Sequence, residues 1–300
     1  MTPPPLFILG SPRSFTSLLC AMLGQHPQAY GVPELNLFAG ETVGDLLDQM
    51  KGIRQFQMHG LLRTVAELYA HEQNLVAVEM ANRWVLKYYD CKTGEIYDKL
   101  CKKVAPKMII DKSPVYGTRP EILNRIGENF GHAYFLHLVR HPRTQGNSMM
   151  NVAEGMMTIL SSSIDYSTEP PTVDPQYLWL RMQRNIINFL GSIPERQKMF
   201  LRGEDILSHP EIYFEKICRW LNLDWHEQAY ESMLHPEKSC YACLGPYGAP
   251  LGNDPNFLKS PIFKQRGIPP STLSGLLPWR NDGKGFIKDV IELAQELGYS

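Results

Sequence analysis

The chain has 300 residues, of which 43% are hydrophobic, and its formal net charge is −1. This length and composition suffice for one large domain with a sizeable core. The near-zero charge excludes a global electrostatic field that attracts nucleic acid or an anionic membrane, so any anion must be bound by a local positive cluster.

The first predicted unit is a strand, a tight loop and a helix. Leu6–Leu9 is an apolar run typical of a buried parallel strand, and apolar residues at helical spacing follow the loop. This geometry points backbone N–H groups and the positive end of a helix dipole at an anion. An ordinary turn with a surface arginine is the alternative. The candidate anion ligands are Ser11, Pro12, Arg13, Ser14, Phe15, Thr16 and Ser17.

This loop differs from the Walker loop of nucleotide-triphosphate-binding proteins. Counted from Gly10, the second glycine position is Phe15 and the lysine position is Thr16, which argues against a P-loop kinase. The run Ser-Pro-Arg-Ser-x-Thr-Ser-Leu-Leu resembles the 5′-phosphosulfate loop of sulfotransferases. Those enzymes use 3′-phosphoadenosine 5′-phosphosulfate (PAPS) as sulfuryl donor.

Glu34 stands after a proline and among apolar residues. It is either an acid in a surface turn or a general base, because burial raises the pKa of a carboxyl group and favours proton uptake from a hydroxyl. The segment resembles tyrosylprotein sulfotransferases and the sulfotransferase domains of polyketide pathways, which implies that Glu34 is the catalytic base. Pro33-Glu34-Leu35 is similar to the polyketide-type domains, whereas Asn36 replaces an arginine of the tyrosylprotein enzymes.

A mostly helical pattern over about residues 40–105 predicts a helical insertion beside the sheet. A second buried strand, Lys107–Asp111, then ends in Asp-Lys-Ser-Pro. A lysine at this end of a strand faces the crevice in which open α/β sheets bind ligands, although a solvated loop lysine is the alternative. The tetrapeptide resembles the motif of the catalytic lysine in tyrosylprotein and polyketide sulfotransferases, which implies that Lys112 stabilises the transferring sulfuryl group.

A third strand, residues 133–139, runs into Arg140 and a helix that contains Ser148. A guanidinium group offers a phosphate a charged fork, and a hydroxyl adds a neutral donor. In PAPS enzymes an arginine at the strand end and a serine eight residues later bind the 3′-phosphate. Arg140 and Ser148 have this spacing.

A fourth strand, Lys198–Arg202, is followed by Gly203-Glu-Asp-Ile. Sulfotransferases have an aromatic residue near the adenine at the position of Gly203, and cytosolic ones have another at that of Leu18. The resemblance therefore implies the phosphate contacts but leaves the adenine contacts open. Ser208 is expected to cap the next amphipathic helix.

Residues 234–283 are rich in Gly, Pro, Ser and Asn, which predicts a functional lid. Gly252–Phe257 resembles a Gly-Asp-Pro-Asn-Phe segment of polyketide-type domains, which carry an active-site histidine shortly afterwards. This chain has no histidine after His235, which leaves Glu34 as the candidate base. The dipeptide Arg266-Gly267 is similar to a basic C-terminal motif of cytosolic sulfotransferases, which implies a further 3′-phosphate contact.

The six cysteines agree with a reducing compartment. Cys240 and Cys243 have the spacing of half a zinc site, but no second Cys or His pair follows, so we expect no metal. Met1–Pro5 lacks a basic signal-peptide start, and no stretch approaches the roughly 20 apolar residues of a membrane span. We expect a cytoplasmic protein without nucleic-acid or membrane partners. The oligomeric state stays open.

These patterns predict one α/β domain over residues 1–300, with a P-loop-like central parallel sheet flanked by helices in the sulfotransferase fold. The resemblance implies transfer of a sulfuryl group from PAPS to a hydroxyl of a small-molecule or carrier-bound secondary metabolite, leaving 3′-phosphoadenosine 5′-phosphate (PAP). Glu34 then removes the acceptor proton, while Arg13 and Lys112 stabilise the developing charge. The alternatives are a tyrosylprotein-like sulfotransferase and a non-catalytic nucleotide-binding protein, which has no use for Glu34 and Lys112.

Overall fold

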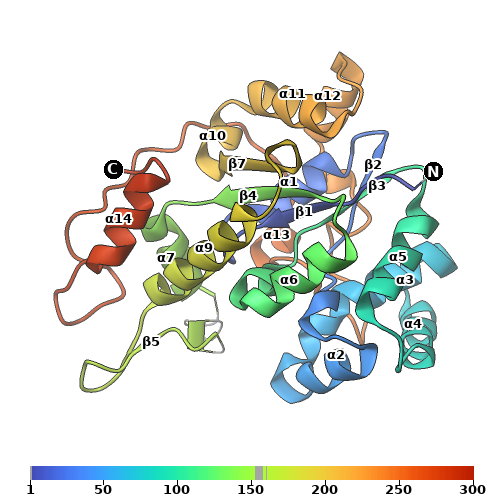
Figure 1. Ribbon diagram of the computed structural model, residues 1–300, viewed down its shortest axis with the longest axis horizontal. Coiled ribbons are helices and arrows are strands. Elements are labelled where there is room, and N and C mark those ends of the chain that lie inside the picture. Colours follow the sequence, from blue (N-terminus) through green and yellow to red (C-terminus); the bar gives the residue numbers. More distant parts are fainter. Residues whose placement is uncertain (1, 153–157, 160) are drawn as a thin grey trace.

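The computed structural model describes residues 2–152, 158–159 and 161–300, and its centre is a parallel sheet. The sheet has five strands in the order β2-β3-β1-β4-β7. Figure 1 shows helices on both sides of these strands, which confirms the predicted α/β fold class. The strands are β1 (Leu6–Leu9), β2 (Ala29–Gly31), β3 (Met108–Asp111), β4 (Tyr134–Val139) and β7 (Lys198–Arg202).

Helices fill most of the connections between the strands. Four of them, α2 to α5, form the helical segment predicted over about residues 40–105, and they lie together at one end of the sheet in Figure 1. A separate antiparallel pair is made by β5 (Ile164–Asp165) and β6 (Thr172–Val173). The helices are α1 (Thr16–Leu23), α2 (Val43–Gln49), α3 (His59–Ala70), α4 (Leu75–Lys87), α5 (Thr93–Val104), α6 (Pro120–Asn129), α7 (Pro142–Met150), α9 (Pro175–Gly191), α10 (Gly203–Ser208), α11 (Pro210–Leu221), α12 (Glu227–Met233), α13 (Pro255–Lys259) and α14 (Lys288–Glu296).

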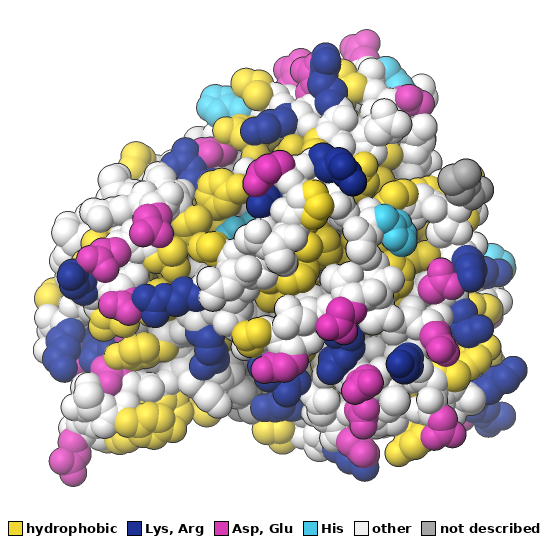
Figure 2. Space-filling model, in the orientation of Figure 1, with side chains coloured by type: hydrophobic (Ala, Val, Ile, Leu, Met, Phe, Trp, Pro, Cys, Tyr) yellow, Lys and Arg dark blue, Asp and Glu magenta, His cyan; other side chains and the backbone are white. Residues whose placement is uncertain are grey.

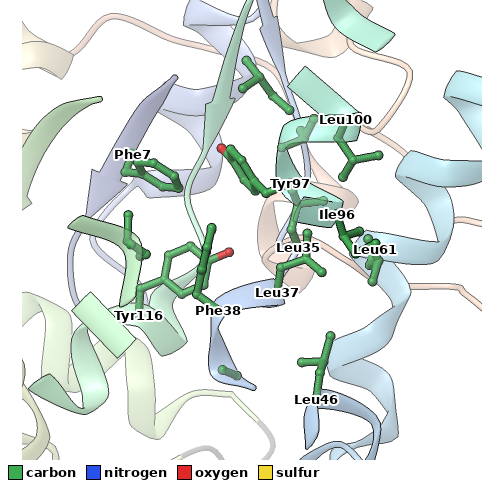
Figure 3. Packing of buried hydrophobic residues seen from close by; sticks show 14 of the residues in the cluster. Phe7, Leu35, Leu37, Phe38, Leu46, Leu61, Ile96, Tyr97, Leu100 and Tyr116 are labelled. Carbon is green, nitrogen blue, oxygen red and sulfur yellow. The ribbon is translucent and has the colours of Figure 1, made fainter. Parts of the chain in front are cut away.

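The two faces of β1 are buried in different clusters. Phe7 and Leu9 pack with residues of α5, α6 and α9, whereas Leu6 and Ile8 pack with residues of α1 and α11. This alternation follows from the two-residue period of a strand. The Phe7 ring stacks on Tyr97 of α5 with centroids 5.2 Å apart. Figure 3 shows both side chains among the buried residues of this cluster. Because both faces are covered, the strand is continuously apolar.

The strand order places a topological switch point at the carboxyl end of β1. The chain places β3 and β2 on one side of β1 and then crosses to place β4 and β7 on the other. Such a topological switch point is where open α/β sheets bind ligands. The candidate residues gather there because each follows the end of a strand: Arg13 follows β1, Glu34 follows β2, Lys112 follows β3 and Arg140 follows β4.

Two details differ from the sequence-based expectation. Strand β2 was not predicted, since it is only three residues long and ends in Gly31, whose added Cβ would lie 2.5 Å from the Cys20 carbonyl oxygen. The expected cap by Ser208 is wrong. Ser208 is the last residue of α10, its hydroxyl donates to the Glu204 carbonyl oxygen at 2.9 Å, and α11 starts at Pro210. Proline suits that first position because its φ is preset for a helix.

The predicted lid, residues 234–283, is fastened to α3 by Arg63. The Arg63 side chain is fully buried, and its Nη1 donates to the carbonyl oxygens of Cys243 at 2.9 Å and Leu251 at 3.0 Å. Its Nε donates to Gln73 Oε1 at 2.6 Å. A buried charge needs such acceptors, so the first part of the lid is a packed segment despite its lack of regular structure.

Candidate active site

The loop between β1 and α1 has an unusual backbone. Gly10 passes directly beside β4, where an added Cβ would lie 2.5 Å from the Leu138 carbonyl oxygen. Arg13 and Phe15 both have positive φ, 67° and 64°, which residues with a side chain rarely adopt. Phe15 precedes α1 and makes no side-chain capping bond. The first N–H groups of α1 are therefore not capped by that residue, and they suit an anion.

Other residues of the loop hold its shape. The hydroxyls of Ser11 and Ser14 are buried and lie 2.9 Å from each other. The Pro12 carbonyl oxygen accepts a hydrogen bond from Gln145 Nε2 of α7 at 2.8 Å. Thr16 is the first residue of α1 and is buried as well. These side chains fix the loop against α7 and the sheet.

Glu34 and Lys112 meet beyond the carboxyl ends of β2 and β3. Lys112 is fully buried, and its Nζ donates to Glu34 Oε1 at 2.7 Å and to Ser17 Oγ at 2.7 Å. The Glu34 side chain is 27% exposed, so its carboxylate reaches both the buried ammonium and solvent. The structure thus brings together Ser17, Glu34 and Lys112, which belong to three separate segments of the sequence.

The turn that carries Lys112 is held by its neighbours. The Asp111 carboxylate accepts hydrogen bonds from Ser113 Oγ at 2.8 Å and from the Tyr116 hydroxyl at 2.8 Å. Burial raises the pKa of Asp111 to about 6, and these hydrogen bonds partly oppose the shift. Ser113 Oγ also accepts from the Asn36 N–H at 2.9 Å, which ties this turn to the segment of Glu34.

Arg13 lies between α7 and the predicted lid. Its Nε donates to Ser148 Oγ at 3.0 Å, and its Nη1 forms an ion pair with the Asp254 carboxylate. Arg140 donates from Nη1 to the Arg13 carbonyl oxygen at 2.8 Å and from Nε to Thr144 Oγ1 at 3.0 Å. The predicted pair Arg140 and Ser148 is therefore brought together through Arg13.

The positive charge of this site is local. Burial lowers the pKa of Arg140 to about 10, Glu204 and Asp254 oppose that shift, and Arg13 and Arg266 reinforce it. Arg13 and Arg266 are thus both close enough to repel the Arg140 guanidinium. Elsewhere the charges mix, and Figure 2 shows basic and acidic side chains interspersed across the drawn face.

The predicted dipeptide Arg266-Gly267 lies on the surface. Both residues are exposed, and the Arg266 N–H donates to the Leu207 carbonyl oxygen of α10 at 3.2 Å. The Arg266 carbonyl oxygen in turn accepts from Ser208 Oγ at 3.4 Å. This backbone anchor holds the dipeptide beside α10, and the Arg266 charge acts on Arg140 from there.

The predicted lid contacts the site through a residue that the sequence analysis missed, Asp254. Its backbone N–H donates to Ser17 Oγ at 3.3 Å, and its Oδ1 accepts from the Asn256 N–H at 2.8 Å and caps α13. Just before it, the Gly252 carbonyl oxygen accepts from the Glu34 N–H at 2.7 Å. The available signals were Asp-Pro, a frequent helix start, and the resemblance of Gly252–Phe257 to polyketide-type domains, but neither linked Asp254 to Arg13.

Among the described residues, no group of three or more His, Cys, Asp or Glu side chains could hold a metal ion. In the same part of the chain, no helix is both long and apolar enough to cross a bilayer. Cys240 and Cys243 are free and exposed, and the Cys243 carbonyl oxygen accepts from Arg63.

Comparison with solved structures identifies the fold. The chain is similar to the sulfotransferase domain from the curacin biosynthetic pathway, with a TM-score of 0.77 and 24% identity over 99% of this chain and 98% of that chain. It is also similar to the sulfotransferase domain from the Synechococcus PCC 7002 olefin synthase, with a TM-score of 0.73 and 26% identity over 100% of this chain and 96% of that chain. The predicted sulfotransferase fold is therefore confirmed.

The family is shown by the sequence itself. The profile of the sulfotransferase family matches residues 4–227, and the chain belongs to that family. This match includes the loop after β1, Glu34, Lys112, Arg140 and Ser148. A comparison with curated proteins finds no match.

Proposed function

We propose that the protein transfers a sulfuryl group from PAPS to a hydroxyl of a small-molecule or carrier-bound secondary metabolite. The observation that carries this proposal is the contact of the buried Lys112 ammonium with Glu34 and Ser17 beside the cationic loop. Burying an ammonium group is costly unless it is paired and hydrogen-bonded. A protein that only binds a nucleotide has no use for this arrangement, which favours an enzyme.

The donor-binding role rests on the cluster of cations. Arg13 and Arg266 each repel Arg140, so a ligand that carries several negative charges relieves that repulsion. PAPS has two anionic ends, the phosphosulfate and the 3′-phosphate. We assign the phosphosulfate to Arg13 and the first N–H groups of α1, and the 3′-phosphate to Arg140 and Ser148.

The proposed reaction uses Glu34 and Lys112, which are in contact with each other. The acceptor oxygen forms a bond to sulfur while the bond from sulfur to the 5′-phosphate oxygen breaks, and the hydroxyl proton goes to Glu34. Lys112 and Arg13 stabilise negative charge on the sulfuryl oxygens and on the departing phosphate. A positioned general base typically contributes about 10²–10⁴ in rate.

The acceptor class is inferred from similarity. The 26% identical domain is part of an olefin synthase, and the match extends over the whole chain, which favours a biosynthetic acceptor. The tyrosylprotein alternative loses support because Asn36, which replaces the arginine of those enzymes, has a structural role. Its side chain donates to the Gln57 carbonyl oxygen at 2.8 Å.

Thermal unfolding and mass spectrometry test the proposal. PAP and PAPS are expected to raise the melting temperature, since a ligand at 100 times its Kd adds about 2.7 kcal/mol of stability. ATP with magnesium is the control nucleotide and should shift the melting temperature less. A screen of hydroxylated metabolites should then give a PAPS-dependent gain in mass. Binding of PAP without any transfer would favour the non-catalytic alternative.

Arg140→Ala is expected to weaken PAP binding about 10- to 150-fold, because a hydrogen bond to a charged group is worth about 1.5–3 kcal/mol. Isothermal titration calorimetry measures this loss. Arg143→Ala is the matched control, since its guanidinium donates to the carbonyl oxygens of Thr272 and Leu276 at 2.8 and 2.7 Å. Equal affinities of the two variants would remove Arg140 from the donor site.

Asp254→Asn is expected to tighten PAP binding about 5-fold. The Asp254 carboxylate pairs with Arg13 and so competes with an incoming anion, and an ion pair near a surface is worth up to about 1 kcal/mol. Asparagine caps helices as well as aspartate does, so α13 should keep its start. Calorimetry with PAP gives the affinity. A weaker complex would mean that Asp254 supports donor binding.

A further inference from the structure

Phe15 has a backbone conformation that is costly for an aromatic residue. It occupies the second glycine position of a Walker-type loop, and its φ of 64° and ψ of 11° place it in the left-handed region. A bulky residue is a genuine outlier there, and such strain clusters at ligand sites. A strained backbone persists only where its surroundings hold it, so the contacts of the Phe15 ring are expected to explain this conformation.

The Phe15 ring lies against Gly203, the first residue of α10. A Cβ added to Gly203 would lie 2.5 Å from Phe15 Cδ2 and 3.3 Å from Cε2, so even alanine collides there. Gly203 follows β7, which places it at the same edge of the sheet as the loop after β1. The large side chain at 15 and the absent side chain at 203 are thus complementary.

The same ring is next to Arg140, the proposed anchor of the 3′-phosphate. The guanidinium carbon of Arg140 lies 4.4 Å from the Phe15 ring centroid, and Arg13 is two residues away in the loop. The ring is half-buried, so part of it stays open. An apolar hollow of about 10 Å³, too small to hold a base itself, adjoins the ring and is lined by Phe15, Leu18, Leu19, Met22, Leu138, Gly203, Ile206 and Leu207.

We infer that Phe15 provides the aromatic surface on which the donor's purine base stacks, and that Gly203 makes room for this ring. The inference rests on the proposed function and adds the base-binding residue to it. A purine has a planar π face, which stacks on an aromatic ring whatever its hydrogen-bonding edge. The apolar side chains around the ring suit a base that lies on its open part, whereas the charged groups of the donor bind Arg13 and Arg140.

The test compares PAP binding by wild type, Phe15→Leu and Phe15→Tyr in calorimetry. Phe15→Leu is expected to bind PAP about 5- to 140-fold more weakly, because this factor corresponds to the free energy of stacking one base on an aromatic ring. Phe15→Tyr should bind PAP like wild type. Inorganic pyrophosphate, which lacks a base, is the second probe. It should stabilise wild type and Phe15→Leu equally against thermal unfolding.

A reciprocal exchange gives an independent check. Gly203→Phe alone should lose PAP affinity because the new ring collides with Phe15. Combining Gly203→Phe with Phe15→Gly should restore part of the affinity, since one aromatic ring again borders the hollow.

The possible outcomes distinguish a failure of the Phe15 assignment from a failure of the proposed donor. If wild type binds PAP and Phe15→Leu binds it equally well, the inference fails and the proposed function stands. If Phe15→Leu loses pyrophosphate binding as strongly as PAP binding, the ring only shapes the loop, and the inference also fails. If wild type does not bind PAP, the proposed donor is wrong, and the inference falls with it.

Discussion

Glu34→Gln is expected to lower turnover about 10²–10⁴-fold while PAP affinity stays almost unchanged. Glutamine has the shape of glutamate and still accepts a hydrogen bond from Lys112 Nζ, which lies 2.7 Å from Glu34 Oε1. It cannot take a proton from an acceptor hydroxyl. The measurement is turnover at saturating PAPS with an acceptor from the metabolite screen, together with calorimetry for PAP.

Glu79→Gln is the matched control for this change. Glu79 lies on α4 and pairs with Arg83 at 3.1 Å, so the variant makes the same chemical change at an exposed ion pair. Turnover of this control should equal that of wild type, because exposed pairs contribute little. If Glu34→Gln keeps wild-type turnover, Glu34 is not the base, and a different proton acceptor must be sought.

The sheet could be predicted because four of its strands are recognisable locally. Leu6–Leu9 and Met108–Asp111, for example, are buried on every residue, and such apolar runs stand out in a sequence. Strand β2 lacks that signal. Strand β2 exists because Ala29, Tyr30 and Gly31 pair with residues of β3, for example Tyr30 with Ile109. Such pairing is a tertiary contact that the local sequence does not encode.

The sequence also offered single candidate residues for the site, but it gave no information on their contacts. Lys112 and Glu34 are 78 positions apart, and they meet because β2 and β3 are adjacent and parallel. Arg13 and Ser148 are 135 positions apart and meet because β4 lies on the other side of β1. Local patterns carry no information on strand order, so these pairings appear only in the folded chain.

Asp254 shows the same limit for irregular segments. The predicted lid has no periodicity, and its position is set by contacts such as that of Gly252 with Glu34. A close approach of Gly252 to Gly60 permits this path, since an added Cβ on Gly252 would lie 2.8 Å from Gly60 Cα. Packing against α3 thus determines which residues of the predicted lid reach the site.

Lys112→Met is expected to lower turnover about 10²–10³-fold, the size of effect seen when one preorganised donor of a developing charge is removed. Methionine fills a similar volume but carries no charge. The fold should survive, because the Glu34 side chain is 27% exposed and its carboxylate can be hydrated once the ammonium is gone. Thermal unfolding tests this point, and turnover at saturating PAPS measures the catalytic loss.

The control is Lys198→Met. Lys198 is the first residue of β7, its Nζ pairs with Glu195 Oε1 at 2.7 Å, and its side chain is only 21% exposed. Its turnover should equal that of wild type. The double variant Lys112→Met with Glu34→Gln is the decisive test, because residues that act in one step give non-additive losses. It should lose little more than the worse single variant. Fully multiplied losses would mean that Lys112 and Glu34 act in separate steps, which contradicts a single transfer across their shared contact.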